Sequence, residues 1–287
     1  MKTVVITGAS SGIGFAVAGK FAGKGYRIIG VGHCHINAEK ARNQLMDAYP
    51  NAEIVYFSGE LMQQREVLRV ADEIGRYLEE RCGGALEVLI NNVGGVRSLY
   101  TTTEEGYEQQ FALNHLAAFL LTYRLLPYLQ KAQGRILMTG SNSHKGIKIH
   151  WEDPMLRKGY NPLTAYKQSK LCSILFARGL NDRYAEKSLR AYAVDPGLVN
   201  TDIGNKQTGS LVNFIWTLRK RHGVLPEIPA QTYLFLSDQP QAPEGLYYYL
   251  CRKRPFSKQV TKENADRLFE LSEQLCGITY GRSEAAG

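Results

Sequence analysis

The stretch Thr7-Gly8-Ala9-Ser10-Ser11-Gly12-Ile13-Gly14 decides the fold of this chain. It follows the short apolar run 4–6 and precedes an apolar helical pattern over 14–21, so it predicts a strand, a turn and a helix. Its glycines, spaced Gly-x-x-x-Gly-x-Gly, let the backbone turn sharply and approach a phosphate closely. The following helix offers free N–H groups and the positive end of its dipole to an anion. A glycine-rich turn without a ligand is the alternative, but the strand–turn–helix context favours a bound dinucleotide.

Strand and helix patterns alternate along the rest of the 287 residues. The strand patterns are apolar on both faces, as burial between two layers of helices requires. Such alternation implies right-handed crossovers between parallel strands. We therefore predict a single doubly wound α/β domain over 1–287, with a mostly parallel seven-stranded sheet and helices on both faces. The expected strands are 4–6, 27–31, 54–57, 86–90, 135–138, 189–194 and 246–250, and the expected helices are 14–21, 38–49, 63–80, 103–129, 164–184 and 262–275.

Two long segments interrupt this alternation, at 144–162 and at 197–226. Connections of such length in a compact domain are usually functional, so we expect both to be substrate loops. The second contains an apolar stretch over 211–218, which suits a lid over an apolar ligand and ordinary core packing equally well. In the first, Trp151 and Tyr160 are candidates for substrate contact.

Composition and charge exclude several classes of protein. The net charge is +8, but the basic residues are scattered and no nucleic-acid motif accompanies the clusters 219–221 and 252–254, so we expect no nucleic-acid partner. A basic surface still permits association with a membrane surface. No segment has the roughly 18 consecutive apolar residues of a membrane span. The five cysteines are widely spaced and lack zinc-ligand spacing, which favours a reduced, cytoplasmic setting and no metal site.

Tyr166 and Lys170 are the pair of residues that points most directly to chemistry. Four residues apart on a predicted helix, they share a face and can touch. A free tyrosine has a pKa of about 10, so it exchanges protons reluctantly at neutral pH. A fixed ammonium group favours the phenolate and lowers that pKa. The pair therefore suits a general acid or base, although the same spacing also occurs on solvated helices.

The glycine spacing resembles that of the short-chain dehydrogenase/reductase family. It differs from the Gly-x-Gly-x-x-Gly of two-domain dehydrogenases and from the Gly-x-x-Gly-x-x-Gly of extended sugar-nucleotide epimerases. Further motifs follow in the family's order: Asn91-Asn92-Val93-Gly94 resembles Asn-Asn-Ala-Gly, and Pro196-Gly197 with Thr201 resembles Pro-Gly-x-x-x-Thr. The resemblance covers nearly the whole chain and implies a Rossmann fold that binds a nicotinamide cofactor.

A narrower likeness points to one branch of that family. The segments 103–106, 114–122, 168–178, 245–248 and 271–273 resemble the retinol-dehydrogenase-like branch. Its members reduce or oxidise lipophilic aldehydes, ketones and alcohols. The resemblance thus implies a small lipophilic substrate, and it leads us to expect a homo-oligomer formed through the long helices.

The resemblance also implies roles for single residues. Tyr166 is the expected general acid in carbonyl reduction and the base in the reverse direction, and Lys170 lowers its pKa and holds the nicotinamide ribose. Ser141 is expected to bind the substrate oxygen, with Ser143 as a rival. Asn114 is expected to hold a water molecule that extends a proton relay; by itself, an asparagine in an apolar helix is more often structural.

The cofactor residues follow from the same motifs. The region 30–35 at the end of the second strand has no acidic residue for a ribose 2′-hydroxyl, and His33 falls where the branch often has an arginine. NADP is therefore favoured, with NAD possible. Asp195 stands where the branch commonly has another residue type, and it receives no role. The expected cofactor-binding residues are Gly8, Ser10, Ser11, Gly12, Ile13, Gly14, His33, Glu60, Leu61, Asn91, Asn92, Val93, Gly94, Tyr166, Lys170, Pro196, Gly197, Val199 and Thr201.

Together these observations predict an NADP(H)-dependent oxidoreductase that interconverts a carbonyl and an alcohol on a small apolar substrate. A catalytically idle NADP-binding sensor or scaffold is the alternative, although members that lose activity typically lose the tyrosine or the lysine. A sugar-nucleotide epimerase is disfavoured by the glycine spacing and the modest length after the tyrosine.

Overall fold

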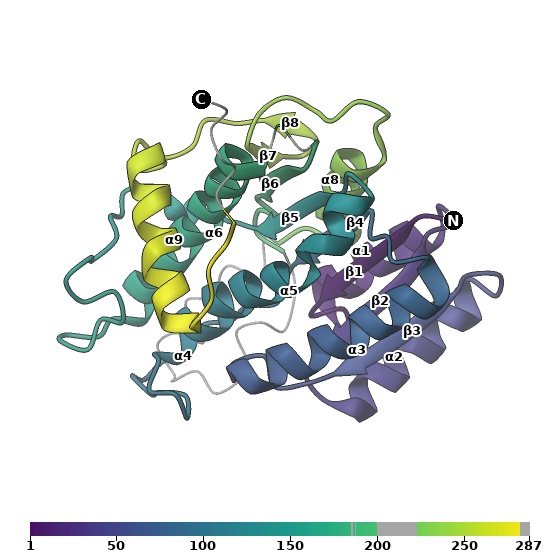
Figure 1. Ribbon diagram of the computed structural model, residues 1–287, viewed down its shortest axis with the longest axis horizontal. Helices are drawn as coiled ribbons and strands as arrows, with labels where there is room; N and C mark the ends of the chain where they lie inside the picture. The colour runs from purple at the N-terminus through teal and green to yellow at the C-terminus, as the bar shows by residue number, and fades with distance from the viewer. Residues whose placement is uncertain (185, 187, 200–222, 282–287) are drawn as a thin grey trace.

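The structure, a computed structural model, describes residues 1–184, 186, 188–199 and 223–281 (Figure 1). Its centre is a sheet with the strand order β3-β2-β1-β4-β5-β6-β7-β8. Neighbouring strands are parallel except for the last pair, β7 and β8. The chain starts in the middle of the sheet at β1, builds outward to β3, and returns to build the other half. This is the doubly wound arrangement predicted from the sequence.

The elements are bounded as follows. The strands are β1 Thr3–Thr7, β2 Arg27–Gly32, β3 Ile54–Ser58, β4 Val88–Asn91, β5 Arg135–Thr139, β6 Arg190–Val194, β7 Tyr247–Tyr249 and β8 Arg252–Lys253. The helices are α1 Gly12–Ala22, α2 His35–Ala48, α3 Gln64–Cys82, α4 Gln109–Phe111, the π-helical turn η1 Ala112–Leu116, α5 Ala117–Lys131, the 3₁₀ turn η2 Asn142–His144, α6 Pro162–Tyr184, α8 Glu227–Asp238 and α9 Lys262–Cys276.

Alternate residues of each strand bury two separate apolar layers. Val4 and Ile6 of β1 pack with residues of α1, α2 and α8, whereas Val5 between them packs with residues of α3, α5 and α6. Successive side chains of a strand point to opposite faces, so a strand that is apolar throughout needs helices on both sides. This is the physical reason that the chain folds into three layers, with the sheet in the middle (Figure 1).

The sheet has eight strands in the described part of the chain, one more than the seven predicted. The additional strand, β8, consists of Arg252 and Lys253, which are both exposed and carry no apolar pattern. It forms because Leu250 and Cys251 make a two-residue turn with φ of +48° and +58°, which folds the chain back antiparallel to β7. Positive φ at both turn residues suits the twist of a tight hairpin, and here it occurs without glycine.

Two helical predictions also need correction. The helix expected over 103–129 begins at Gln109, where the Glu108 carboxylate accepts hydrogen bonds from the backbone of Gln110 and Phe111. A π-helical turn, η1, then separates α4 from α5. Helix α8 was not predicted, because a proline such as Pro229 usually indicates that a helix ends or is interrupted. Pro229 lies in the first turn of α8, where backbone N–H groups have no partner within the helix, so proline is tolerated there.

An aromatic cluster fixes the C-terminal segment to the helical layer. Phe269 of α9 lies 5.2 Å from Phe119 of α5 and 5.4 Å from Phe176 of α6, measured between ring centroids. Tyr280 closes the cluster 4.8 Å from Phe119, and its hydroxyl donates to the Phe119 carbonyl at 2.7 Å. Helix α9 therefore lies along α6 and shields the aromatic side chains of α5 and α6 (Figure 1).

The hairpin turn yields a test of stability. Leu250 is exposed and adopts a left-handed conformation that asparagine tolerates better than leucine and that a β-branched residue tolerates least. We expect Leu250→Asn to raise the free energy of unfolding by about 0.5–1 kcal/mol and Leu250→Val to lower it by about 1 kcal/mol. Urea denaturation of both variants checks this, and equal stability of the two would contradict the turn geometry.

Candidate active site

The glycine loop lies at the carboxyl end of β1, where it turns into α1. Gly8 and Gly12 have φ of +68° and +55°, in the region that favours glycine. A Cβ atom at Gly14 would lie 2.2 Å from the carbonyl oxygen of Gly8, so α1 can start this close to the strand only with glycine there. The sequence pattern therefore corresponds to three separate backbone constraints.

The start of α1 is suited to an anion. Ser11 precedes the helix in an extended conformation, and within the described residues no side chain caps the first turn. The first N–H groups of a helix have no acceptor within the helix, and a phosphate can accept hydrogen bonds from them. Ile13 is buried, so it anchors the turn, whereas Ser11 is exposed and Ser10 is partly exposed. These features fit the pyrophosphate of a dinucleotide.

Thr7, the last residue of β1, joins the glycine loop to the neighbouring strand. Its hydroxyl oxygen accepts hydrogen bonds from the backbone N–H groups of Asn92 and Val93 at 2.9 and 3.0 Å. The Asn92 amide donates back to the Thr7 carbonyl at 3.1 Å. Asn91 differs, because its side chain donates to Thr122 of α5 and so supports the helical layer. Thr7 was not predicted as a site residue.

Asn114 lies in the π-helical turn and is buried. Its side-chain oxygen accepts from the N–H of Gly95 at 2.8 Å, and its amide donates to the Gly95 carbonyl at 3.0 Å and to the Ser169 hydroxyl at 2.9 Å. Ser169 in turn donates to the carbonyl of Tyr166 at 2.8 Å. Asn114 thus joins the loop after β4, which includes Gly94, to the helix that carries Tyr166.

Tyr166 and Lys170 share one face of α6, as predicted from their spacing. The Lys170 ammonium nitrogen lies 5.5 Å from the centroid of the Tyr166 ring, and it donates to the carbonyl of Thr139 at 2.8 Å. Lys170 is only 6% exposed, while Tyr166 is half-buried. Burial lowers the pKa of Lys170 to about 8, and the negative charge of Asp195 opposes that shift. The ammonium form thus predominates at neutral pH.

Ser141 follows β5 and faces the same edge of the sheet. Its hydroxyl oxygen accepts from the backbone N–H of Ser143 at 3.1 Å, so its own proton is left to donate. Its carbonyl lies 2.6 Å from Nδ1 of His144, a buried residue that the sequence analysis did not single out. Ser143, the predicted rival, contributes its backbone N–H to this arrangement.

His33 and Glu60 contact each other at the ends of β2 and β3. Nδ1 of His33 lies 3.1 Å from a carboxylate oxygen of Glu60, with His33 exposed and Glu60 partly exposed. Leu61, the next residue, is buried. The sequence analysis predicts both His33 and Glu60 as cofactor-binding residues, and the structure places the two side chains in contact.

The remaining predicted residues divide into three groups. Pro196, Gly197 and Val199 follow β6, and Val199 pairs with Val224 at the base of the second long loop. Thr201 and the apolar stretch 211–218 lie outside the described residues. Trp151 and Tyr160 of the first loop pack within the protein, Trp151 against Arg267 and Tyr160 by hydrogen bonds to Glu108 and Gln110.

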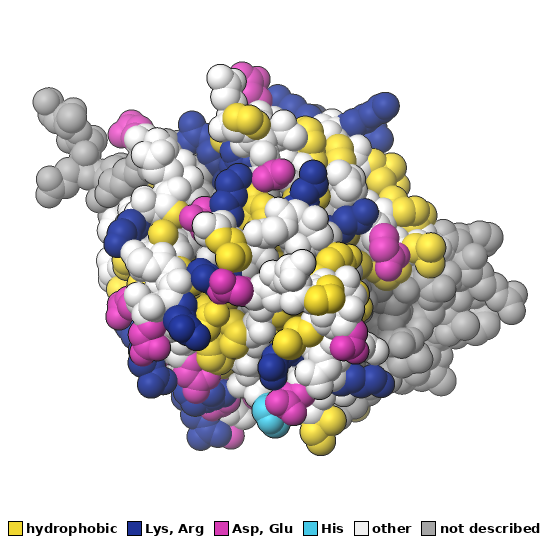
Figure 2. Space-filling view, turned by 90° about the vertical axis from the view of Figure 1, so that its right-hand side faces the viewer, with side chains coloured by type: hydrophobic (Ala, Val, Ile, Leu, Met, Phe, Trp, Pro, Cys, Tyr) yellow, Lys and Arg dark blue, Asp and Glu magenta, His cyan; other side chains and the backbone are white. Residues whose placement is uncertain are grey.

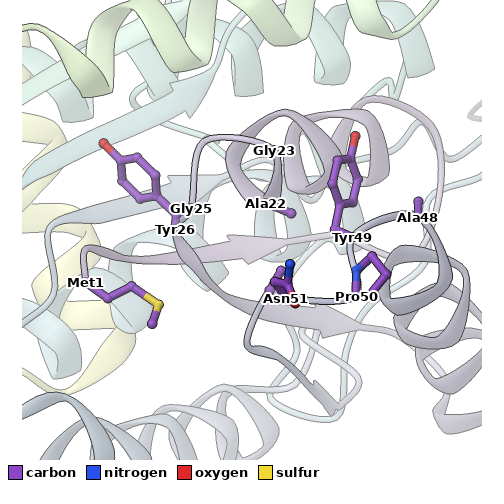
Figure 3. A pocket seen from close by; sticks show the side chains of 10 residues that line it. Met1, Ala22, Gly23, Gly25, Tyr26, Ala48, Tyr49, Pro50 and Asn51 are labelled. Atoms are coloured by element: carbon purple, nitrogen blue, oxygen red, sulfur yellow. The ribbon is translucent and has the colours of Figure 1, made fainter.

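A cavity of about 430 Å³ lies away from these residues (Figure 3). It is lined by the ends of α1 and α2 and by Met1, Tyr26 and Tyr49, and it contains none of the predicted site residues. Among the described residues, no cluster of histidine, cysteine, aspartate or glutamate is arranged to hold a metal ion. Figure 2 shows basic and acidic side chains intermingled over one face, in agreement with the scattered charge.

Comparison with known proteins identifies the family. The short chain dehydrogenase family model matches residues 2–210. The chain belongs to the short-chain dehydrogenase family. This short-chain dehydrogenase is 32% identical to retinol dehydrogenase 12 of Mus musculus, covering 97% of this chain and 87% of that protein. It is 33% identical to retinol dehydrogenase 14 of Mus musculus, covering 96% and 86%, and 32% identical to retinol dehydrogenase 13 of Homo sapiens, covering 96% and 85%.

These relatives confirm the retinol-dehydrogenase-like branch. The short-chain dehydrogenase is therefore an oxidoreductase that acts on alcohols with a nicotinamide cofactor. Among solved structures it is similar to an uncharacterized protein from Mycobacterium paratuberculosis, with a TM-score of 0.76 and 27% identity over 98% of this chain and 95% of that one. A short-chain dehydrogenase from Sphingobium yanoikuyae in complex with NADPH shares the fold, with a TM-score of 0.67 and 20% identity over 100% and 99%.

The glycine loop gives a direct test. Gly14→Ala places a methyl group against the Gly8 carbonyl, so we expect it to abolish measurable NADPH binding and to destabilise the fold by about 1–3 kcal/mol. Gly19→Ala in the same helix is the matched control, because its Cβ would meet side-chain atoms only at an ordinary 3.6 Å. Fluorescence titration with NADPH and thermal melting measure both effects. Wild-type affinity in the Gly14 variant would contradict the assignment.

Proposed function

We propose that this short-chain dehydrogenase is an NADP(H)-dependent enzyme that interconverts a carbonyl and an alcohol on a small lipophilic substrate, with Tyr166 as proton donor and acceptor. One observation carries the proposal: a buried ammonium, that of Lys170, lies 5.5 Å from the Tyr166 ring and is fixed by the Thr139 carbonyl. A cation held in this way stabilises the phenolate, which brings proton exchange toward neutral pH.

Tyr166, Ser141 and Lys170 have separate roles in the proposed reaction. The cofactor, when bound, supplies or accepts the hydride. Tyr166 delivers a proton to the substrate oxygen during reduction and removes it during oxidation. The Ser141 hydroxyl oxygen accepts a hydrogen bond from the Ser143 N–H. Its own O–H is therefore available to donate a hydrogen bond to the same substrate oxygen. Lys170 stabilises the negative charge left on Tyr166 and is available to the nicotinamide ribose.

Asn114 takes part through its position in the π-helical turn. Its side-chain oxygen and both amide protons are engaged by Gly95 and Ser169. We therefore propose that the Asn114 side chain acts by orienting the loop after β4 relative to α6. Single π-helical turns within helices often occur at functional sites.

Cofactor selectivity is assigned to His33. The β2 strand ends without an acidic residue, so no carboxylate from that strand repels a 2′-phosphate. Glu60 lies 3.1 Å from Nδ1 of His33 and orients the ring. With Nδ1 directed at Glu60, Nε2 is the ring nitrogen that remains for a 2′-phosphate.

The substrate class follows from the relatives and from the second loop. The names of the relatives refer to retinol, a lipophilic alcohol. At the base of the loop, Leu198, Leu225 and Ile228 are exposed apolar side chains. We propose that they line the entrance for an apolar substrate. Cytoplasmic location, association with a membrane surface and homo-oligomer formation stay predictions; among the residues described, no helix has the length and apolar character to cross a bilayer.

Removal of the Tyr166 hydroxyl tests the mechanism. In an NADPH and NADH oxidation screen against steroids, retinal, quinones and aliphatic ketones, we expect Tyr166→Phe to lower kcat by at least about 10²-fold while NADPH affinity stays within a few fold. Tyr184→Phe is the control, because it removes a hydroxyl from the last residue of the same helix, where the hydroxyl donates to the Gly281 carbonyl. Full turnover by Tyr166→Phe would refute the role of Tyr166 as proton donor and acceptor. If the wild-type protein binds cofactor but turns over no substrate in the screen, the idle sensor would be favoured.

The role of His33 predicts a change in cofactor selectivity. His33→Ala removes the ring next to the end of β2, so the preference for NADPH over NADH should fall several-fold relative to the wild type. Dissociation constants for both cofactors, measured for both proteins, check this. An unchanged preference in His33→Ala would assign selectivity to other residues.

A further inference from the structure

Asp195 is a buried carboxylate in the middle of the edge that carries the site. It directly follows β6, between the ends of β5 and β7, and only 8% of the residue is exposed. A carboxylate in such a place is destabilising unless it is paired or hydrogen-bonded. Neither the family motifs nor the proposed mechanism gives Asp195 a role, but its contacts suggest one.

Two hydrogen bonds hold this carboxylate. The Tyr247 hydroxyl of β7 donates to Oδ2 at 2.8 Å, and the backbone N–H of Gly197 donates to Oδ1 at 2.9 Å. Gly197 has φ of +71°, and a Cβ atom there would lie 2.9 Å from the ring of Tyr249. The Pro196–Gly197 turn is therefore fixed by Asp195 on one side and by β7 on the other.

The imidazole ring of His144 packs against the ring of Tyr247. The two ring centroids are 4.8 Å apart with an interplanar angle of 66°. Nδ1 of His144 lies 2.6 Å from the Ser141 carbonyl, and Nε2 accepts from the N–H of Ser257 at 3.1 Å. A carbonyl only accepts and an N–H only donates, so His144 is the neutral tautomer with its proton on Nδ1. Burial lowers the pKa of His144, which keeps it neutral.

Asp195 lies beside the strand end that holds Lys170. Lys170 donates to the carbonyl of Thr139, and Thr139 pairs with Val194, the residue before Asp195, in the register of β5 and β6. Burial lowers the pKa of Lys170 to about 8, and the Asp195 carboxylate is the group that opposes this shift. Burial and the same carboxylate raise the pKa of Tyr247 well above its usual value, so that hydroxyl remains a donor. Within the part of the chain that the structure describes, the titratable groups that face Asp195 or Tyr247 are His144 of η2, Tyr166 and Lys170 of α6, Tyr233 of α8 and Tyr247 of β7.

We propose that Asp195, held by Tyr247, is a positioning residue that keeps Lys170 charged and fixes the Pro196–Gly197 turn against the cofactor. The inference rests on the proposed function, because the charge of Lys170 matters through the proton exchanged at Tyr166. Asp195 acts through Lys170 and through the turn, without touching the reacting atoms. Loss of the carboxylate lets Lys170 lose its proton at a lower pH and loosens the turn.

An NMR titration of Lys170 tests the electrostatic half. In protein labelled with [ε-¹³C]lysine, the Lys170 signal is assigned by its disappearance in Lys170→Arg. We expect a titration midpoint near pH 8 in the wild type, as its pKa of about 8 requires. Asp195→Asn should lower the midpoint by about one unit or more, because it removes the opposite charge. Tyr247→Phe, which keeps the carboxylate, should leave it within about half a unit.

Cofactor affinity tests the geometric half. Asp195→Asn and Tyr247→Phe should each weaken NADPH binding several-fold, because both loosen the support of the Gly197 turn. Tyr192→Phe is the matched control: Tyr192 is an equally buried tyrosine on the adjacent strand, and its hydroxyl donates to the Pro243 carbonyl at 2.8 Å. It should change neither NADPH affinity nor the Lys170 titration.

These readouts need no turnover, so they are independent of whether a carbonyl substrate is found. An enzyme that reduces nothing in the screen would refute the proposed function and leave the titration and affinity results standing. A Lys170 midpoint that is the same in folded Asp195→Asn and wild type would overturn the inference. If Asp195→Asn does not fold, the test uses Tyr247→Phe instead. If Tyr247→Phe binds NADPH as tightly as Tyr192→Phe does, the inference is overturned.

Discussion

The buried ammonium of Lys170 is the constraint on which the rest of the site depends. Moving such a charge out of water is unfavourable, and the lowered pKa of Lys170 records this. Three features of the fold compensate: the Thr139 carbonyl at the end of β5, the Tyr166 ring on the same helix, and the Asp195 charge at the end of β6. Each comes from a different part of the chain, so the cost of burying the ammonium is offset only when the sheet and α6 are folded together.

The parallel sheet explains how these parts meet. Parallel strands end at one edge, and β1, β4, β5 and β6 place Thr7, Asn92, Thr139 and Asp195 there. Hydrogen bonds link the first three of these ends: the Thr139 hydroxyl donates to Asn92, and the Asn92 amide donates to Thr7. Lys170 of α6 donates to the Thr139 carbonyl, so the glycine loop and α6 are parts of one hydrogen-bonded edge. A displacement at one strand end would reach the others.

Much of this architecture could be predicted from the sequence, because it depends on local patterns. The apolar strands, the glycine spacing and the Tyr166–Lys170 interval are short-range signals, and the sheet and α6 are where they predict. Helix α8 and strand β8 were missed, one because of Pro229 and the other because an exposed Arg-Lys pair carries no pattern. Thr7, His144 and Tyr247 were missed because their contacts are long-range, although Thr7, as the polar last residue of an apolar strand, did offer a signal.

The aromatic cluster around Phe269 and Tyr280 has a consequence for quaternary structure. Side chains of the chain's own C-terminal segment already fill the strip along α5 and α6, and they are fully buried there. A second molecule cannot use this strip while α9 stays in place. Truncation before α9 would therefore expose the aromatic rings of α5 and α6 to water and favour non-specific association.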